Sequence, residues 1–119
     1  MPANVSTWHE RAAQLVPESR AFIGGAYVEA LSGAQFDNVN PATGRALGRI
    51  SAGDVPDIER AVAAAKAAFE KGAWSRTKPA HRKTVLAACA QSIVAHREEL
   101  ALLETLDMGK PISDSLKVD

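Results

Sequence analysis

The sequence predicts an α/β fold in which short β-hairpins precede a run of amphipathic helices. Paired glycines and a dense turn cluster separate short apolar runs in the first third of the chain. After Gly53 the spacing of apolar residues changes from about two to about 3.6, the period of an α-helix. Gly109 and Pro111 are residues that commonly follow a helix end, so they place the end of the last long helix.

A short leading helix is expected from about Thr7 until Pro17 ends it. Thr7 and Glu10 have the spacing of a capping box. Three apolar residues then fall on one helical face: Trp8, Ala12 and Leu15. Residues 1–20 are therefore interpreted as a leading helix and linker.

Two strand pairs are expected next. Gly24 and Gly25 can adopt the positive φ angles that a two-residue hairpin turn requires. The cluster Asn40-Pro41-Ala42-Thr43-Gly44 predicts a second turn. The expected strand segments are residues 22–23, 26–28, 35–39 and 47–51.

Helices occupy the rest of the predicted fold. The first is capped by Asp54 and ended by Gly72, the second begins near Pro79, and a further run bends near His96 and ends at Asp107. Apolar stripes on the first two helices are expected to face inward: Ile58, Val62, Ala65 and Phe69, then Val85, Leu86, Cys89 and Ile93.

A last amphipathic helix is expected to begin after Pro111. No terminating residue follows it before Asp119, so we expect the sequence to be cut rather than complete.

Composition restricts the classes of function. A chain of 119 residues can hold one domain. Lys plus Arg equals Asp plus Glu at 14 each, so no excess positive charge predicts binding to nucleic acid or to an anionic membrane. A single cysteine excludes an internal disulfide, and no apolar run approaches the length of a membrane span. We expect a cytoplasmic protein without nucleic-acid or membrane partners.

No pattern predicts a catalytic or cofactor-binding residue in this chain. Cys89 is a candidate nucleophile, but on an apolar helical stripe a buried thiol is expected to be inert. The three histidines are scattered without the spacing of a metal site. Gly109-Lys110 lacks the upstream glycine and the following Ser or Thr of a phosphate-binding loop.

Asp107 is the one residue that breaks a local rule. It lies at a helix C-terminus, where free carbonyls carry partial negative charge and a carboxylate costs about 0.3–1 kcal/mol without compensation. Two partners can compensate: the ammonium of Lys110, or a bound cation that takes a carboxylate oxygen as ligand. The residues alone favour Lys110.

Several segments, taken in order, resemble the N-terminal part of the aldehyde dehydrogenase superfamily. They are Phe22-Ile23-Gly24-Gly25, Asn40-Pro41-Ala42-Thr43-Gly44, Ala61 to Phe69, Trp74, His81-Arg82 and Leu103 to Pro111. The leading segment looks most like the bacterial γ-glutamyl-γ-aminobutyraldehyde dehydrogenases. The resemblance implies an α/β fold made of the N-terminal helices and β-hairpins of the NAD-binding domain. It also implies that residues 1–119 form an incomplete part of that domain, truncated before the dinucleotide-binding sheet.

The resemblance further implies an oxidoreductase that converts an aldehyde, an aminoaldehyde being one candidate, to a carboxylic acid with NAD or NADP. Members of the family are longer than this chain and often form homo-oligomers. Their nucleophilic cysteine, general base and dinucleotide-binding strands lie beyond the matching segment, so the chain alone is expected to be inactive.

A metal site is also implied by the resemblance. In the family a monovalent or similar hard cation is often held by the carboxylate that matches Asp107 and by backbone carbonyl oxygen from the segment that matches Asn38 and Val39. All-oxygen ligation suits such an ion. In a full-length protein this resemblance favours the cation over Lys110 as the partner of Asp107. It does not do so in the fragment, because a further ligand of the cation comes from a later strand.

A function of another class stays open. The chain could be a self-contained, non-enzymatic α+β module that binds a partner through its alanine-rich helical faces.

Overall fold

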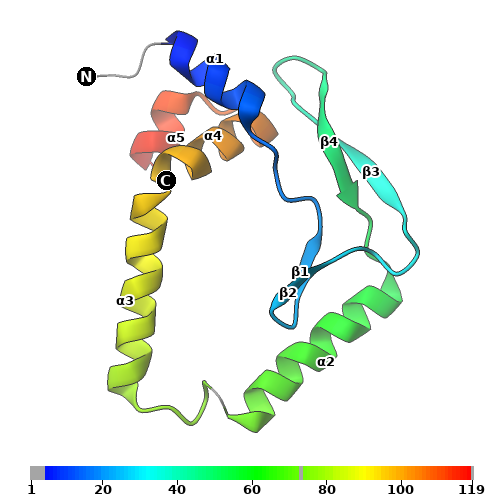
Figure 1. Cartoon of the computed structure of the whole chain (residues 1–119), viewed down its shortest axis with the longest axis vertical. Coiled ribbons are helices and arrows are strands. Elements are labelled where there is room, and N and C mark those ends of the chain that lie inside the picture. Colours follow the sequence, from blue (N-terminus) through cyan, green and yellow to red (C-terminus); the bar gives the residue numbers. More distant parts are fainter. Residues whose placement is uncertain (1–4, 73, 119) are drawn as a thin grey trace. The chain divides into compact units, whose positions relative to one another are not determined.

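The computed structural model describes residues 5–72 and 74–118, and Figure 1 shows the order of their elements. The elements are α1 (Val5–Gln14), β1 (Ala21–Ile23), β2 (Ala26–Val28), β3 (Gln35–Val39), β4 (Ala46–Ser51), α2 (Val55–Lys71), α3 (Pro79–Ala95), α4 (Arg97–Met108) and α5 (Ile112–Val118). They combine helices with two two-stranded sheets, as the sequence predicts. The ends of the expected residue range, 1–4 and 119, lie outside the described residues.

The described residues form two compact units. One contains residues 5–18, 37–49 and 96–118, and the other contains residues 19–36, 50–72 and 74–95. The strands β3 and β4 run through both units, whereas each helix belongs to one of them.

In the second unit, β1 and β2 form the predicted hairpin. They are antiparallel, with Phe22 opposite Tyr27 and Ile23 opposite Ala26. The turn between them is made by Gly24 at φ 64° and Gly25 at φ 89°, backbone angles that glycine adopts without steric cost. The prediction of a glycine-pair hairpin is confirmed.

Helix α2 begins and ends where its capping residues predict. The Asp54 side chain accepts a hydrogen bond from the Val55 amide at 2.7 Å, and Gly72 ends the helix at φ 75°. Asp57 completes a capping box, since its Oδ2 accepts from the Asp54 amide at 3.1 Å. Its Oδ1 also accepts from the amide of Leu31 at 3.1 Å, so one carboxylate, 5% exposed, joins the turn after β2 to the start of α2.

The apolar stripes that the sequence places on the inward faces of α2 and α3 are uncovered in this chain. Phe69 on α2 is 73% exposed, Leu86 on α3 is 61% exposed, and none of the residues of α3 is buried. Within the described residues the buried apolar side chains are Ala30, Ala101 and Leu102. The physical reason is that burial needs a second layer over a helix face, and the described part of the chain supplies none there.

In the first unit, α1 is longer at its start than expected. Because the helix already includes Val5, Thr7 lies inside it and cannot be its N-cap, so the predicted capping box is wrong. Helix α1 ends at Gln14, before Pro17, as predicted. Arg11 joins it to α4 through an ion pair with Glu98 at 2.8 Å, and the same guanidinium lies 4.5 Å from the ring centroid of Trp8.

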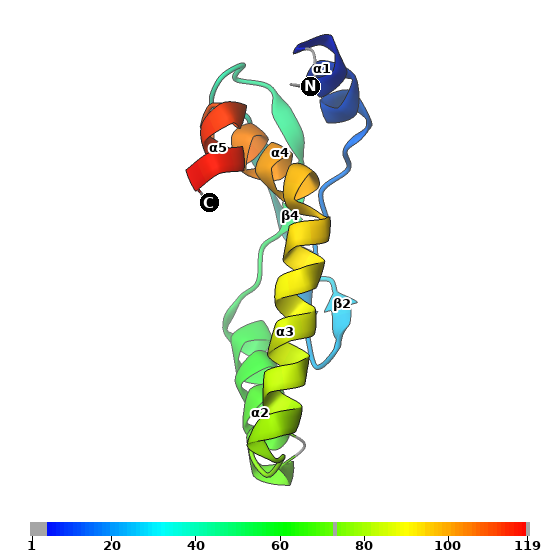
Figure 2. The same ribbon diagram turned by 90° about the vertical axis from the view of Figure 1, so that its left-hand side faces the viewer.

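Helices α4 and α5 lie side by side in both views (Figures 1 and 2). Where a bend was expected near His96 the structure has a break between two helices, because α3 ends at Ala95 and α4 begins at Arg97. Helix α4 ends at Met108, one residue beyond the expected Asp107, and Gly109 follows at φ 78°. Among the described helices, none has the length and apolar character needed to cross a membrane.

Candidate functional site

The candidate site lies in the first unit, where the end of α4 meets the end of β3. The Nδ2 of Asn38 donates a hydrogen bond to Oδ1 of Asp107 at 2.7 Å, across a sequence separation of 69 residues. Asn38 is half-buried and Asp107 is exposed. A hydrogen bond from a neutral donor to a charged acceptor is stronger than one between two neutral groups.

Besides Lys110 and a cation, the side chain of Asn38 is thus a further partner for Asp107, one that the sequence did not suggest. Within residues 5–72 and 74–118, the Asn38 amide is the hydrogen-bond partner of Asp107, and the Oδ2 of that carboxylate carries no hydrogen bond. Lys110 lies 3.4 Å from Glu104, a different acid. The amide dipole of Asn38 stabilises the carboxylate only in part, because it carries no net charge.

The C-terminal turn of α4 holds Asp107 close to the turn after β3. Gly109 donates its amide to the Thr105 carbonyl at 3.0 Å and ends the helix in the left-handed region. A Cβ atom on Gly109 would lie 3.0 Å from Cγ of Pro41, a tighter separation than side chains normally adopt. Glycine at this position thus permits the close approach of the two segments.

Hydrogen bonds made by Asn40 stabilise the turn that contains Pro41. Asn40 is buried, and its side-chain Oδ1 accepts a hydrogen bond from the backbone amide of Ala42 at 2.8 Å. The backbone amide of Asn40 donates to the Arg45 carbonyl at 2.9 Å. Its carbonyl also accepts from the Gly44 amide at 2.8 Å. These bonds fix the turn that directly follows Asn38 and Val39.

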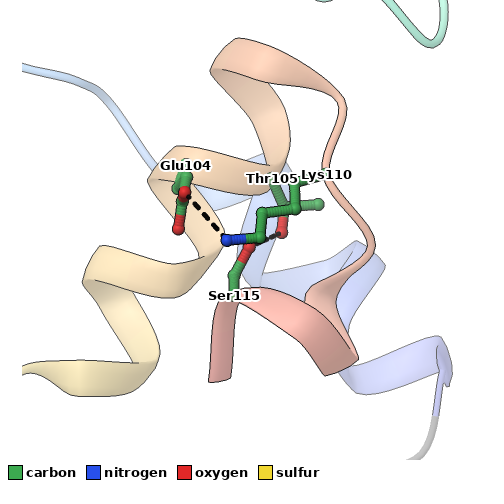
Figure 3. Close-up of polar contacts among 4 residues, drawn as sticks. All are labelled: Glu104, Thr105, Lys110 and Ser115. Atoms are coloured by element: carbon green, nitrogen blue, oxygen red, sulfur yellow. Dashed lines mark hydrogen bonds and ion pairs between the residues drawn. The ribbon is translucent and has the colours of Figure 1, made fainter. Parts of the chain in front are cut away.

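Helix α5 supports the other side of the α4 end, as Figure 3 shows. Lys110 Nζ lies 3.4 Å from Oε1 of Glu104, and both side chains are less than one-third exposed. The hydroxyls of Thr105 and Ser115 lie 3.2 Å apart, with Ser115 only 4% exposed. The helical turn that carries Asp107 is therefore held from α5 as well as from β3.

The donor set suits a hard monovalent cation. Asp107 could offer a carboxylate oxygen to such an ion, and Asn38 and Val39, consecutive residues of β3, each have a backbone carbonyl oxygen. Among the described residues there is no group of three or more His, Cys, Asp or Glu that could hold a metal ion, so a transition-metal centre has no ligand set there. Oxygen donors that together carry one negative charge are the kind of ligand set that a hard monovalent cation takes.

The other candidate residues lie at exposed positions in the described part of the chain. The thiol of Cys89 is exposed on α3, so the expectation of a buried thiol is wrong for this chain. His9, His81 and His96 are also exposed. Glu98 pairs with Arg11. None of these contacts combines a nucleophile with a base.

Sequence reasoning misses two features, and only one of them has a local signal in the sequence. The side chain of Asn38 had been assigned no role, because its acceptor lies on a distant helix. Asp57 had been passed over, although its position three residues after Asp54 is a capping-box signal that was available.

Comparisons with known proteins agree with the fold and with the resemblance. The model of the aldehyde dehydrogenase family matches residues 27–119. The NADP/NAD-dependent aldehyde dehydrogenase PuuC of Escherichia coli (strain K12) is 47% identical over 116 residues, which make up 98% of this chain and 23% of that protein.

Solved structures give the same result. The γ-glutamyl-γ-aminobutyraldehyde dehydrogenase of Burkholderia cenocepacia J2315 matches with a TM-score of 0.96 and 44% identity, covering 98% of this chain and 24% of that one. The AldA indole-3-acetaldehyde dehydrogenase of P. syringae, solved with NAD⁺, matches with a TM-score of 0.94 and 52% identity, covering 96% and 23%. The chain spans about a quarter of the length of these relatives. The expected fold class is confirmed, and the chain belongs to the aldehyde dehydrogenase family.

Proposed function

We propose that the chain forms the N-terminal part of a cytoplasmic, homo-oligomeric NAD(P)-dependent aldehyde dehydrogenase that oxidises an aminoaldehyde to a carboxylic acid. The observation that carries this proposal is the match over 98% of the chain, at a TM-score of 0.96, to a dehydrogenase of an amino-substituted aldehyde. A second relative, 44% identical over 91% of the chain, is the aminoacetaldehyde dehydrogenase of Pseudomonas aeruginosa.

Within such an enzyme the chain is proposed to act as scaffold and cation site, with the catalytic residues and the cofactor site elsewhere. The open apolar faces of α2 and α3 support a scaffold role. Val62 is 60% exposed and Ile93 is 55% exposed, and such side chains contribute about 1.5–3 kcal/mol each when a further layer covers them. By itself the chain is proposed to be inactive.

A monovalent cation is proposed to bind at Asp107, with carbonyl oxygen from Asn38 and Val39. A bound cation would supply the positive charge that a carboxylate at a helix C-terminus requires. The hydrogen bond between the side chains of Asn38 and Asp107 joins the end of β3 to the end of α4. Support comes from the braced turn and from the α4–α5 contacts, which limit the movement of both segments.

A chimera tests the proposal. The part of the Burkholderia cenocepacia enzyme that matches this chain would be replaced by the chain, and the purified chimera would be assayed with γ-glutamyl-γ-aminobutyraldehyde and NAD or NADP. We expect an increase in absorbance of the reduced nicotinamide, because the two folds superpose over nearly the whole chain.

The control is the Burkholderia enzyme with the same segment deleted. A chimera that folds and oligomerises like the parent enzyme but reduces no cofactor would contradict the proposal. Activity in the isolated chain would contradict the scaffold assignment.

A further inference from the structure

We infer that Asn38 is a positioning residue whose side-chain amide holds the carboxylate of Asp107 in place for the bound cation. The inference rests on the cation site proposed above. It adds a role for the Asn38 side chain, whereas the family resemblance involves only the backbone of that residue.

The first support is the direct contact. The Asn38 Nδ2 lies 2.7 Å from Oδ1 of Asp107, and the other carboxylate oxygen carries no hydrogen bond within the described residues. One oxygen is thus engaged by the protein, while the other is left for a ligand interaction. A side chain anchored at one oxygen loses less rotational freedom when a cation binds than an exposed, unanchored carboxylate does.

The second support is the rigidity of the donor. Asn38 precedes Val39 and the buried Asn40, whose hydrogen bonds to Ala42, Gly44 and Arg45 brace the following turn. The amide of Asn38 is therefore presented from a fixed backbone. A positioning group is effective only when its own placement is fixed by its surroundings.

The third support is the close fit of the two segments beside the hydrogen bond. Pro41 packs where a side chain on Gly109 would not fit, so the α4 end and the turn after β3 meet at two neighbouring points. Breaking the hydrogen bond should release the carboxylate without separating the two segments. Loss of the Asn38 amide should therefore weaken cation binding more than it changes the fold.

The neighbouring residue offers a matched control. Asp37 lies next to Asn38 on β3 and makes an exposed ion pair with Arg49 at 3.7 Å. Its replacement also removes a side-chain interaction from β3, but it leaves the contact with Asp107 intact.

The experiment is a titration of the chimera described above, which supplies the later strand and its further ligand, with NaCl and KCl, with choline chloride keeping the ionic strength constant. The readout is the melting temperature of the chimera, because a cation that binds only the folded protein raises it with concentration. The variants are Asn38→Leu, which keeps the size but removes the donor, Asn38→Thr, which keeps a hydroxyl donor, Asp107→Asn and Asp37→Ala.

We expect the wild type and Asp37→Ala to give the same dissociation constant. Asn38→Leu should bind about tenfold more weakly, because it loses a hydrogen bond to a charged group, and Asn38→Thr should recover part of the loss. Equal responses of the wild type and Asp107→Asn, or no response beyond choline, would overturn the cation site itself.

Loss of binding in Asp107→Asn together with equal affinities for Asn38→Leu and Asp37→Ala would overturn the positioning role alone. If the chimera that carries Asn38→Leu does not melt cooperatively in choline chloride, the Asn38→Thr variant provides the test. Partial affinity in Asn38→Thr then supports the positioning role, and no affinity overturns it.

Discussion

Replacing the buried carboxylate of Asp57 is the sharpest test of how the second unit is held together. Asp57 is 5% exposed and accepts hydrogen bonds from two backbone amides, those of Leu31 and Asp54. In Asp57→Ala both amides lose their acceptor, and the turn after β2 loses its attachment to α2.

The size of the effect follows from these two donors. Both hydrogen bonds are part-buried and have a charged acceptor, and such a bond contributes about 1.5–3 kcal/mol, so the substitution should cost roughly 3–6 kcal/mol locally. A value near the middle of that range is a large fraction of the total stability of a domain, about 5–15 kcal/mol. Asp57→Asn keeps one acceptor oxygen and should lose about half as much.

Amide hydrogen exchange of Leu31 measures the effect directly, because that amide is protected only while its bond to Asp57 is closed. A local loss of about 3 kcal/mol should raise its exchange rate roughly a hundredfold. Glu59→Ala, at an exposed position of the same helix, is the matched control. Equal exchange of Leu31 in Asp57→Ala and Glu59→Ala would refute the reasoning.

Three further predictions concern the isolated chain. With NAD or NADP and a panel of aminoaldehydes it should give no reduced nicotinamide, and turnover that disappears in Cys89→Ala would contradict this. Because its thiol is exposed, Cys89 should be labelled at a similar rate with and without denaturant, so protection in the native chain would show an unrecognised cover over α3. The open faces of α2 and α3 should bind a hydrophobic dye and promote self-association, less so in Phe69→Ser, since large exposed apolar patches drive association. A monodisperse, cooperatively melting monomer that binds no dye would instead favour the interaction module.

The elements of the fold could be predicted because their signals are local. Asp54 and Gly72 cap α2 through hydrogen bonds with residues a few positions away, and Gly24 and Gly25 form a turn through their own backbone freedom. A local prediction that failed, a capping box at Thr7, failed because the helix continues to at least Val5. A spacing pattern shows that a cap is possible, but not that the preceding residues leave the helix.

Half of the candidate site could be predicted and half could not. Asp107 was singled out because a carboxylate at a helix C-terminus conflicts with the helix dipole, which the sequence alone reveals. Its partner was not, since Asn38 lies 69 residues away and only the folding of β3 against the end of α4 brings the two together. The same holds for Pro41 and Gly109, whose close fit depends on both segments.

Burial was the property that the sequence could not determine. The apolar stripes of α2 and α3 show which face of each helix would be covered, but not whether anything covers it. In the described structure these faces are open, and the buried positions include polar residues such as Asp57 and Ser115, where hydrogen bonds offset their desolvation. Helix caps and turns depend on the few residues around them, whereas a buried face depends on surfaces that come from elsewhere. For that reason the sequence by itself determined the elements of this protein and most of their ends, and the tertiary structure decided which side chains meet.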